Sequence, residues 1–563
     1  MKRLEGRPVP FGVTVQEKKV NFSIAVKEKY TCQLLLYRTG SSEPEAVYEM
    51  KAEDAIGEVR FLAVEGIQAR NYEYQYRING KAALDPYVKE VSGRGKFGQE
   101  EETALRGKIV SEGFDWEGDS RPGLPQEDVV AYNMHVRGFS MHSSSKVKKK
   151  GTFEGIVEKI PYLLELGINQ IHCMPVYDFQ EIVNGKINYW GYGPAFYFAP
   201  KASYAANGRS VKGLKNMVKA CHKAGIEVVL NLPFDAAADP QLIVECLRYY
   251  MLEYHIDGFV LNPYVAPMES IRKDPLLKGV KIIKYEEGFQ NAMRRYLKGD
   301  EGTIPEVMYW QKRLSEKDGL INYITNHTGF TLHDLVTYDV KHNEANGEKN
   351  QDGPDYNHSW NCGVEGPSRK KSIQELRRRQ MKNALLLLFL SQGTPCLLAG
   401  DEFGNTQQGN NNVYCQDNEM AWLNWNMLKK DPEFFQFVKG LIAFRKGHPV
   451  LHQAKELLGS DLTGCGIPDI SYHGKNAWQV TETHTQRELG ILLSGAGVKD
   501  ADCFIICNLH WMEHTFAIPA LAKGKRWYRA ISTTEGIMKE PVELGNKKEI
   551  PIGGRTIQVL IGK

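Results

Sequence analysis

Four apolar stretches of the chain end in polar side chains, and these groups limit the chemistry that one shared site could perform. IEVVLN ends at Asn231, GFVLN at Asn262, VKIIKY at Tyr285 and INYITNHT at Thr328. Amides and hydroxyls hold ligands by hydrogen bonds, but an amide is neutral and attacks poorly, whereas covalent and acid–base catalysis usually rely on carboxylates. Acids close to these stretch ends include Asp235, Glu286 and Glu287.

The elements that must position these residues form a repeating pattern from Val129 onward. Short apolar strands such as VVAYNMHV, INQIHCMPV and PCLLAGDEFG alternate with helical patterns, which is typical of a parallel sheet covered by helices. About seven such strands, with an eighth degraded between residues 285 and 320, predict a (β/α)8 TIM barrel over residues 126–455. In such a barrel the strand ends meet at one face, so the four polar positions are expected to lie together.

The segments before and after the predicted barrel have a different hydrophobic pattern, in which apolar and polar residues alternate. Residues 1–125 contain short alternating runs such as KVNFSIAV and YEYQYRI and end in the Pro-, Gly- and acid-rich linker FDWEGDSRPGLPQED. Alternation returns after residue 455 in AWQVTET, DCFIICNLHW and RTIQVLIG. The pattern predicts a β-sandwich over 1–125, including the linker, and a second all-β sandwich over 456–563.

Composition excludes several classes of function. A net charge of +3, from 71 basic and 68 acidic residues, gives no basic stripe for nucleic acid. The longest apolar run, ALLLLFL at 384–390, is too short to span a membrane, and the amino terminus lacks the apolar segment of a secretory signal. Ten scattered cysteines show no metal-like spacing, and the polar loop KHNEANGEKNQDG lacks EF-hand spacing. We expect a cytoplasmic protein without metal or cofactor.

Several longer motifs carry a resemblance to a known family. NYWGYGPAFYFAP, NHTGFTLHDLVTYDVKHNEANGEKNQDG, SWNCGVEGP and GTPCLLAGDEFGNTQQGNNNVYCQDNE resemble the isoamylase and bacterial glycogen-debranching branch of the alpha-amylase superfamily, glycoside hydrolase family 13. PFGVTVQEKKVNFSIAV resembles the glycan-binding, immunoglobulin-like sandwich before the barrel, and NLHWMEHTFAIPAL resembles the sandwich after it. The resemblance covers essentially the whole chain and implies retaining cleavage of alpha-glucans.

The family motifs also show where this sequence departs from the pattern. The family holds Asp at the end of the third strand, where this chain has Asn231, and a sugar-contacting His where it has Ala236. In the fourth strand the family has an orienting Arg and a nucleophilic Asp, whereas this chain has Val260 and Asn262. Retaining hydrolysis needs a nucleophile and an acid ~5 Å apart. The nucleophile position therefore holds an amide.

The remaining two acidic positions are altered as well. The general acid aligns with Tyr285, or with Glu286 after a shift of one residue, and the loop that normally follows is missing. The third carboxylate is replaced by Thr328, beside a surviving His327. Resemblance assigns sugar contacts to Trp190, Tyr192 and His327, because aromatic faces suit a pyranose ring.

Three hypotheses follow. The first is a catalytically silent homologue that binds an alpha-glucan, either a glycogen- or starch-type polysaccharide or an oligosaccharide, or steers an active glucan-metabolising enzyme. The second is an active debranching alpha-1,6-glucosidase with relocated carboxylates, using Glu286, Glu287 or Asp235. The third is a regulatory partner without sugar binding.

Overall fold

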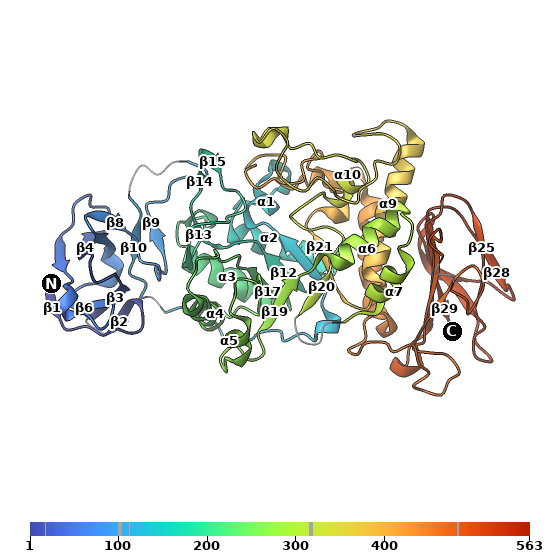
Figure 1. The fold of residues 1–563 in the computed structure, drawn as a ribbon, viewed down its shortest axis with the longest axis horizontal. Helices are drawn as coiled ribbons and strands as arrows, with labels where there is room; N and C mark the ends of the chain where they lie inside the picture. Colours follow the sequence, from blue (N-terminus) through green and yellow to red (C-terminus); the bar gives the residue numbers. More distant parts are fainter. Residues whose placement is uncertain (17–18, 100–103, 112, 315–318, 481–482) are drawn as a thin grey trace.

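The fold places a barrel between two all-β regions, as Figure 1 shows with the amino-terminal strands at one end and the carboxyl-terminal strands at the other. The computed structural model describes residues 1–563 apart from 17–18, 100–103, 112, 315–318 and 481–482. The fold class predicted from the sequence is confirmed. Among the described residues, every helix is too short or too polar to cross a membrane.

The barrel is a closed parallel sheet of seven strands. Six of the seven strands are wholly buried, and β19 is partly buried, which fits the continuous apolar runs in the sequence. In order around the barrel the strands are β11 (Ala131–Met134), β12 (Gln170–Cys173), β17 (Glu227–Asn231), β18 (Gly258–Val260), β19 (Lys281–Tyr285), β20 (Leu320–Asn322) and β21 (Thr394–Leu398).

The eighth strand expected between residues 285 and 320 is absent from the described part of that segment. Two helices occupy it, α6 (Glu287–Lys298) and α7 (Ile304–Lys312). The neighbouring strands β19 and β20 pair directly, with Lys284 opposite Leu320 and Tyr285 opposite Ile321. The chain passes from β19 into α6 through Glu286 alone, and the barrel closes with seven strands among the described residues.

Amphipathic helices cover the outside of the barrel. Their buried faces, such as Ile156, Ile160 and Leu163 of α2, pack with the outward side chains of the strands into one large core. The other covering helices include α3 (Ser210–Lys223), α4 (Pro240–Tyr254), α9 (Lys371–Phe389) and α11 (Pro432–Gly447), with α2 at Phe153–Leu166.

The amino-terminal region is built from two antiparallel sheets around a core of their own. One has the order β1-β6-β3-β2 and the other β5-β4-β7-β10-β9, with β8 beside β7. The strands are β1 (Lys2–Leu4), β2 (Gly12–Gln16), β3 (Lys19–Ala25), β4 (Cys32–Arg38), β5 (Ala46–Glu49), β6 (Val59–Glu65), β7 (Tyr72–Ile78), β8 (Lys81–Ala83), β9 (Val91–Ser92) and β10 (Arg106–Lys108).

The carboxyl-terminal region has a six-stranded sheet, ordered β22-β23-β24-β29-β26-β27, and a two-stranded sheet, β25-β28. Helix α9 of the barrel packs against β29, as Figure 1 shows. The strands are β22 (Ile470–His473), β23 (Glu488–Leu493), β24 (Asp502–Asn508), β25 (His514–Ala517), β26 (Trp527–Ser532), β27 (Gly536–Glu543), β28 (Glu549–Ile552) and β29 (Thr556–Gly562).

The linker before the barrel is anchored by a buried histidine and carboxylate chain. His222 Nδ1 lies 3.0 Å from Asp119 Oδ2 of the linker, and His222 Nε2 lies 3.0 Å from Asp257 Oδ2. Asp119 also contacts His255 Nδ1 at 2.7 Å. Burial lowers the pKa of His222, but the hydrogen bonds and charges of Asp257 and Asp119 outweigh burial and raise it overall. This ionic chain fixes the linker to the amino-terminal side of the barrel, where β18 begins.

Candidate functional site at the barrel mouth

The first two predicted positions lie at adjacent strand ends. Asn231 is the last residue of β17, and its partner across the ladder is Val260, the last residue of β18. Both are buried, with 8% and 4% of their surface exposed. Val260 belongs to the apolar cluster that fills the barrel interior. Where the family holds an arginine, this chain therefore has interior packing and no charge.

Asn262 and Thr328 lie outside the barrel interior. The sequence predicts Asn262 to face inward with Val260, but β18 ends at Val260, and Asn262 is exposed. Asn262 Oδ1 accepts a hydrogen bond from the Tyr264 amide at 3.0 Å. The strand stops early because Pro263 has no amide hydrogen for the ladder. Thr328 is also exposed, and its hydroxyl donates to Asn326 Oδ1 at 2.8 Å.

The end of β19 places a phenol, not a carboxylate, toward the interior. Tyr285 packs against the interior cluster, and its hydroxyl lies 3.3 Å from His172 Nδ1. Glu286 is the residue that precedes α6 and makes no capping hydrogen bond. Glu286 Oε2 lies 3.9 Å from Lys284 Nζ, and it is buried without a hydrogen-bond partner among the described residues. Glu287 is exposed in the first turn of α6.

The structure brings the three predicted sugar contacts together. The Tyr192 hydroxyl lies 2.6 Å from His327 Nε2, and Trp190 packs edge-on against His327 with ring centroids 5.3 Å apart. On the other side, the amide of Asn133 in β11 lies 3.4 Å from His327 Nδ1. Burial lowers the pKa of His327 to about 4, so the ring is neutral at pH 7. A neutral imidazole both donates and accepts, which suits its place between an amide and a phenol.

The cavity beside this cluster is small. It encloses about 50 Å³ and is lined by residues that include Asn133, His135, Met174, Trp190 and His327. Water occupies ~30 Å³ per molecule in the liquid, and drug-sized ligands occupy pockets of roughly 300–1,000 Å³. The enclosed part of the mouth therefore has room for one or two waters and not for a sugar ring, so a glucan would have to lie across the exposed rim.

The acids near the mouth serve other elements. Glu402 is fully buried and accepts hydrogen bonds from the hydroxyls of Tyr132 at 2.7 Å and Tyr162 at 2.5 Å. Asp401, whose pKa burial raises to about 7, accepts from the Leu332 amide and the Thr325 hydroxyl. Asp235 is exposed and accepts from the Ala237 amide at 2.8 Å. Each of these carboxylates holds backbone or tyrosine hydroxyls in place.

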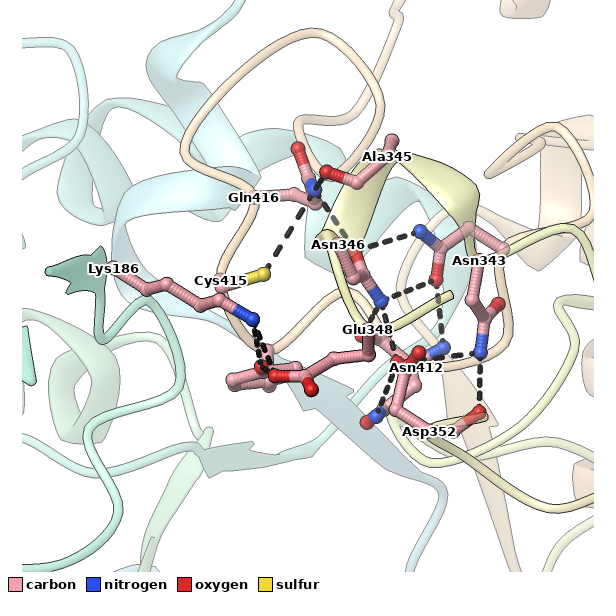
Figure 2. A network of polar contacts seen from close by, with 11 residues as sticks. Lys186, Asn343, Ala345, Asn346, Glu348, Asp352, Asn412, Cys415 and Gln416 are labelled. Atoms are coloured by element: carbon pink, nitrogen blue, oxygen red, sulfur yellow. Dashed lines mark hydrogen bonds and ion pairs between the residues drawn. The ribbon is translucent and has the colours of Figure 1, made fainter. Parts of the chain in front are cut away.

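A network of amide side chains braces two segments that follow β20 and β21. Figure 2 shows Asn346 and Asn412 converging on Asp352, with Nδ2 to Oδ2 distances of 2.7 and 2.9 Å. Gln416 donates to the Asn346 side chain at 2.8 Å. The loop KHNEANGEKNQDG is thus held by amide donors. Within the described residues, no three His, Cys, Asp or Glu side chains are grouped so that they could hold a metal ion.

Known proteins resemble this chain along most of its length. The family described as alpha amylase, catalytic domain, matches residues 135–240. Isoamylase 1, chloroplastic, of Arabidopsis thaliana is 32% identical over 78% of this chain and 75% of its own length. The glycogen operon protein GlgX homolog of Haemophilus influenzae is 32% identical over 78% of this chain and 84% of its own.

This chain belongs to the isoamylase and glycogen-debranching branch of the alpha-amylase superfamily.

Solved structures of the superfamily share the same architecture. The pullulanase of Paenibacillus barengoltzii, in complex with maltohexaose and alpha-cyclodextrin, aligns with a TM-score of 0.75 at 19% identity and covers 98% of this chain and 95% of its own. The pullulanase of Bacillus acidopullulyticus aligns with a TM-score of 0.75 at 18% identity, over 98% of this chain and 75% of its own. At this identity the likeness shows the fold alone.

Sequence reasoning missed three residues of this isoamylase-branch site. Asn133 contacts His327, and His172 contacts Tyr285 inside the barrel. His135 begins helix α1 (Val136–Met141), accepts from the Gly138 amide at 3.0 Å and lies 2.8 Å from the Tyr189 carbonyl oxygen. Asn133 and His135 stand within the motif YNMHVRGF, so the signal was present as one polar residue on an apolar strand and a second directly after it.

Proposed function

We propose that this protein is a catalytically silent homologue that acts in alpha-glucan metabolism by binding a glucan at the barrel mouth. The observation that carries the proposal is the nature of the residues at the four family positions: Asn231, Asn262, Tyr285 and Thr328 include no carboxylate. A glycosyl ester cannot form on an amide, and a hydroxyl supplies no negative charge to oppose an oxocarbenium-like transition state. Loss of a nucleophile alone costs many orders of magnitude in rate.

The hydrogen bonds of the residues at the mouth also support the proposal. The amide of Asn262 and the hydroxyl of Thr328 are bonded into exposed turns. The Tyr192 and His327 pair, in contrast, keeps polar atoms and an aromatic ring together at the mouth. Relatives named for isoamylase and the glycogen operon make an alpha-glucan the ligand class to test.

The catalytic part of the proposal is tested with purified protein, glycogen and a limit dextrin. We expect no release of reducing ends above the background of a heat-inactivated sample. Release of linear chains that the Glu286→Gln substitution abolishes would overturn the proposal.

The binding part is tested by electrophoresis in gels that contain glycogen or amylopectin. We expect wild-type protein to be retarded and the Tyr192→Ala variant to migrate faster through the same gel. The matched control is Tyr309→Ala, because Tyr309 is a half-exposed tyrosine of α7 outside the mouth. Absence of retardation would favour the third hypothesis, a regulatory partner of an active glucan-metabolising enzyme without sugar binding.

One observation favours the alternative of an active alpha-1,6-glucosidase. The buried Glu286 Oε2 has no hydrogen-bond partner among the described residues. A general acid that protonates a substrate oxygen would also have an unbonded carboxyl oxygen before the substrate arrives. Its candidate partners Glu287 and Asp235 are both exposed. The Glu286→Gln comparison above decides between this alternative and a silent site.

A further inference from the structure

A second cavity lies at the opposite end of the barrel from the mouth. It has a volume of about 250 Å³ and opens partly to solvent. Val130 and Asn169 of its wall directly precede β11 and β12, so the cavity is at the amino-terminal face. The full lining is Glu127, Asp128, Val130, Asn169, Arg445, Lys446 and His452.

The cavity wall is fixed by hydrogen bonds from several elements. Asn169 accepts from the Val130 amide at 2.7 Å and donates to the Asp128 carbonyl at 2.8 Å. Asp500, between β23 and β24 of the carboxyl-terminal sheet, contacts His448 Nδ1 at 3.1 Å and accepts from the Val450 amide at 3.2 Å. These bonds fix the segments before β11 and β12, the end of α11 and the turn at Val450 relative to one another.

His452 has one ring nitrogen that no described residue contacts. Its side chain is only 10% exposed, and neither ring nitrogen makes a hydrogen bond to any described residue. Nδ1 lies 3.4 Å from Asp128 Oδ1 as an ion-pair contact, whereas Nε2 has no partner among the described residues. A buried polar group without a partner costs about 1–3 kcal/mol, so an external hydrogen-bonding partner would relieve that cost.

The charges around the cavity cancel. Glu127 and Asp128 oppose Arg445 and Lys446. The two Nη atoms of Arg445 already donate to five backbone carbonyls, those of residues 389, 391, 392, 393 and 451, so these two atoms offer the ligand charge. Lys446 Nζ bonds the Gly167 carbonyl at 2.6 Å and retains further donor capacity. Burial and the Arg445 charge lower the pKa of His452, which keeps the ring neutral.

These groups together define the ligand. The carboxylates of Glu127 and Asp128 and the imidazole of His452 can accept hydrogen bonds from ligand hydroxyls, and the Lys446 ammonium can donate to ligand oxygens. Because the charges of the lining balance, the cavity favours neither an anion nor a cation. At ~30 Å³ per water, the volume corresponds to about eight waters, enough for one sugar ring. We propose that the cavity at the amino-terminal face binds a small neutral polyhydroxylated ligand about the size of a monosaccharide. This site is independent of glucan binding at the mouth.

The proposal is tested by ligand-observed NMR on the full-length protein with D-glucose and myo-inositol as probes and inorganic phosphate as the anionic comparison. We expect saturable binding of a polyol that phosphate does not displace. The His452→Leu substitution should weaken that binding about fivefold to tenfold, the worth of one net hydrogen bond. Because the ring makes no hydrogen bond within the described chain, the variant with leucine there should fold normally.

A second variant and two controls locate the binding. Lys446→Met, which keeps most of the aliphatic stem, should also weaken polyol binding. His484→Leu alters a histidine outside the cavity, with a 76% exposed side chain, and should leave polyol binding unchanged. Tyr192→Ala should leave it unchanged as well, which separates this cavity from the mouth. Equal affinity in wild type, His452→Leu and Lys446→Met would overturn the proposal, and so would preferential phosphate binding or no saturable polyol binding.

Discussion

The two ends of the barrel differ from the usual pattern of a (β/α)8 enzyme. Active sites of this fold lie at the carboxyl-terminal face, and the amino-terminal face is usually concerned with stability. Here the cavity beside the Tyr192 and His327 pair at the carboxyl-terminal mouth encloses about 50 Å³, while the cavity at the amino-terminal face encloses about 250 Å³. At the mouth, Asn262 and Thr328 are bonded into local turns, whereas His452 Nε2 at the other end has no partner among the described residues.

The difference teaches that scaffold and chemistry can separate within one fold. The residues that build the barrel are retained, including Glu402 beneath the mouth with its two tyrosine hydroxyls. The positions that would touch reacting atoms have become amides, a phenol and a hydroxyl. Under the proposed silent function, stability and no longer catalysis would constrain these positions.

The largest expected effect is at the amino-terminal face. Arg445→Met should lower the free energy of unfolding by about 3–4 kcal/mol, because it leaves five buried carbonyls without their donor. Urea denaturation measures the loss. The control Arg209→Met changes an exposed arginine before α3 and should cost little. A loss below about 1 kcal/mol for Arg445→Met would show that this face does not carry the stability assigned to it.

The second effect is an acid sensitivity of the mouth. The pKa of His327 is lowered to about 4 in the folded state, against 6.5 for an unperturbed ring. Below pH 6.5 the unfolded state therefore binds more protons, and stability falls as pH falls. The term reaches about 2.5 kcal/mol near pH 4.5. The free energy of unfolding should be measured near pH 7 and near pH 4.5. Its fall between these two pH values should be smaller for the His327→Gln variant than for wild type. If the free energy of unfolding fell equally in both proteins, His327 would not be the cause of the acid sensitivity.

The third effect has the opposite sign at the other end of the barrel. The pKa of His222 is raised above 6.5, so its stabilisation is complete below pH 6.5 and is lost as pH rises through the folded value. His222→Gln should cost about 1.5–2 kcal/mol near pH 6, in the lower part of the ~1.5–3 kcal/mol that a hydrogen bond to a charged group contributes, and less near pH 8.5. His484→Gln, at an exposed histidine, is the control. A cost that grows with pH would contradict the raised pKa.

The smallest effect tests the mouth directly. Asn262→Asp combined with Thr328→Asp restores two carboxylates of the family, and we expect a stability change within about 0.5 kcal/mol because both sites are exposed. Reducing-end assays should still show background values, since Val260 supplies no orienting arginine. Restored hydrolysis would mean that the missing carboxylates were the only defect.

Much of the site was visible before the fold was known. Trp190, Tyr192 and His327 were assigned as sugar contacts by resemblance, and the structure places them side by side, although that role stays a prediction. The inward orientation of Asn262 was wrong, because strand periodicity cannot show that β18 ends two residues earlier. The eighth strand was wrong for a related reason: direct pairing of β19 with β20 is a long-range hydrogen-bond pattern that leaves no local mark.

The sequence by itself determined the order of strands and helices, the family and the loss of carboxylates, because these depend on residue type and local periodicity. Only the tertiary structure decided how many strands close the barrel, how little space the mouth encloses, and that His452 faces a cavity with balanced charges. Those properties arise from segments far apart in the chain. Glu127 and His452 are separated by more than 300 residues, and only folding places them on one wall.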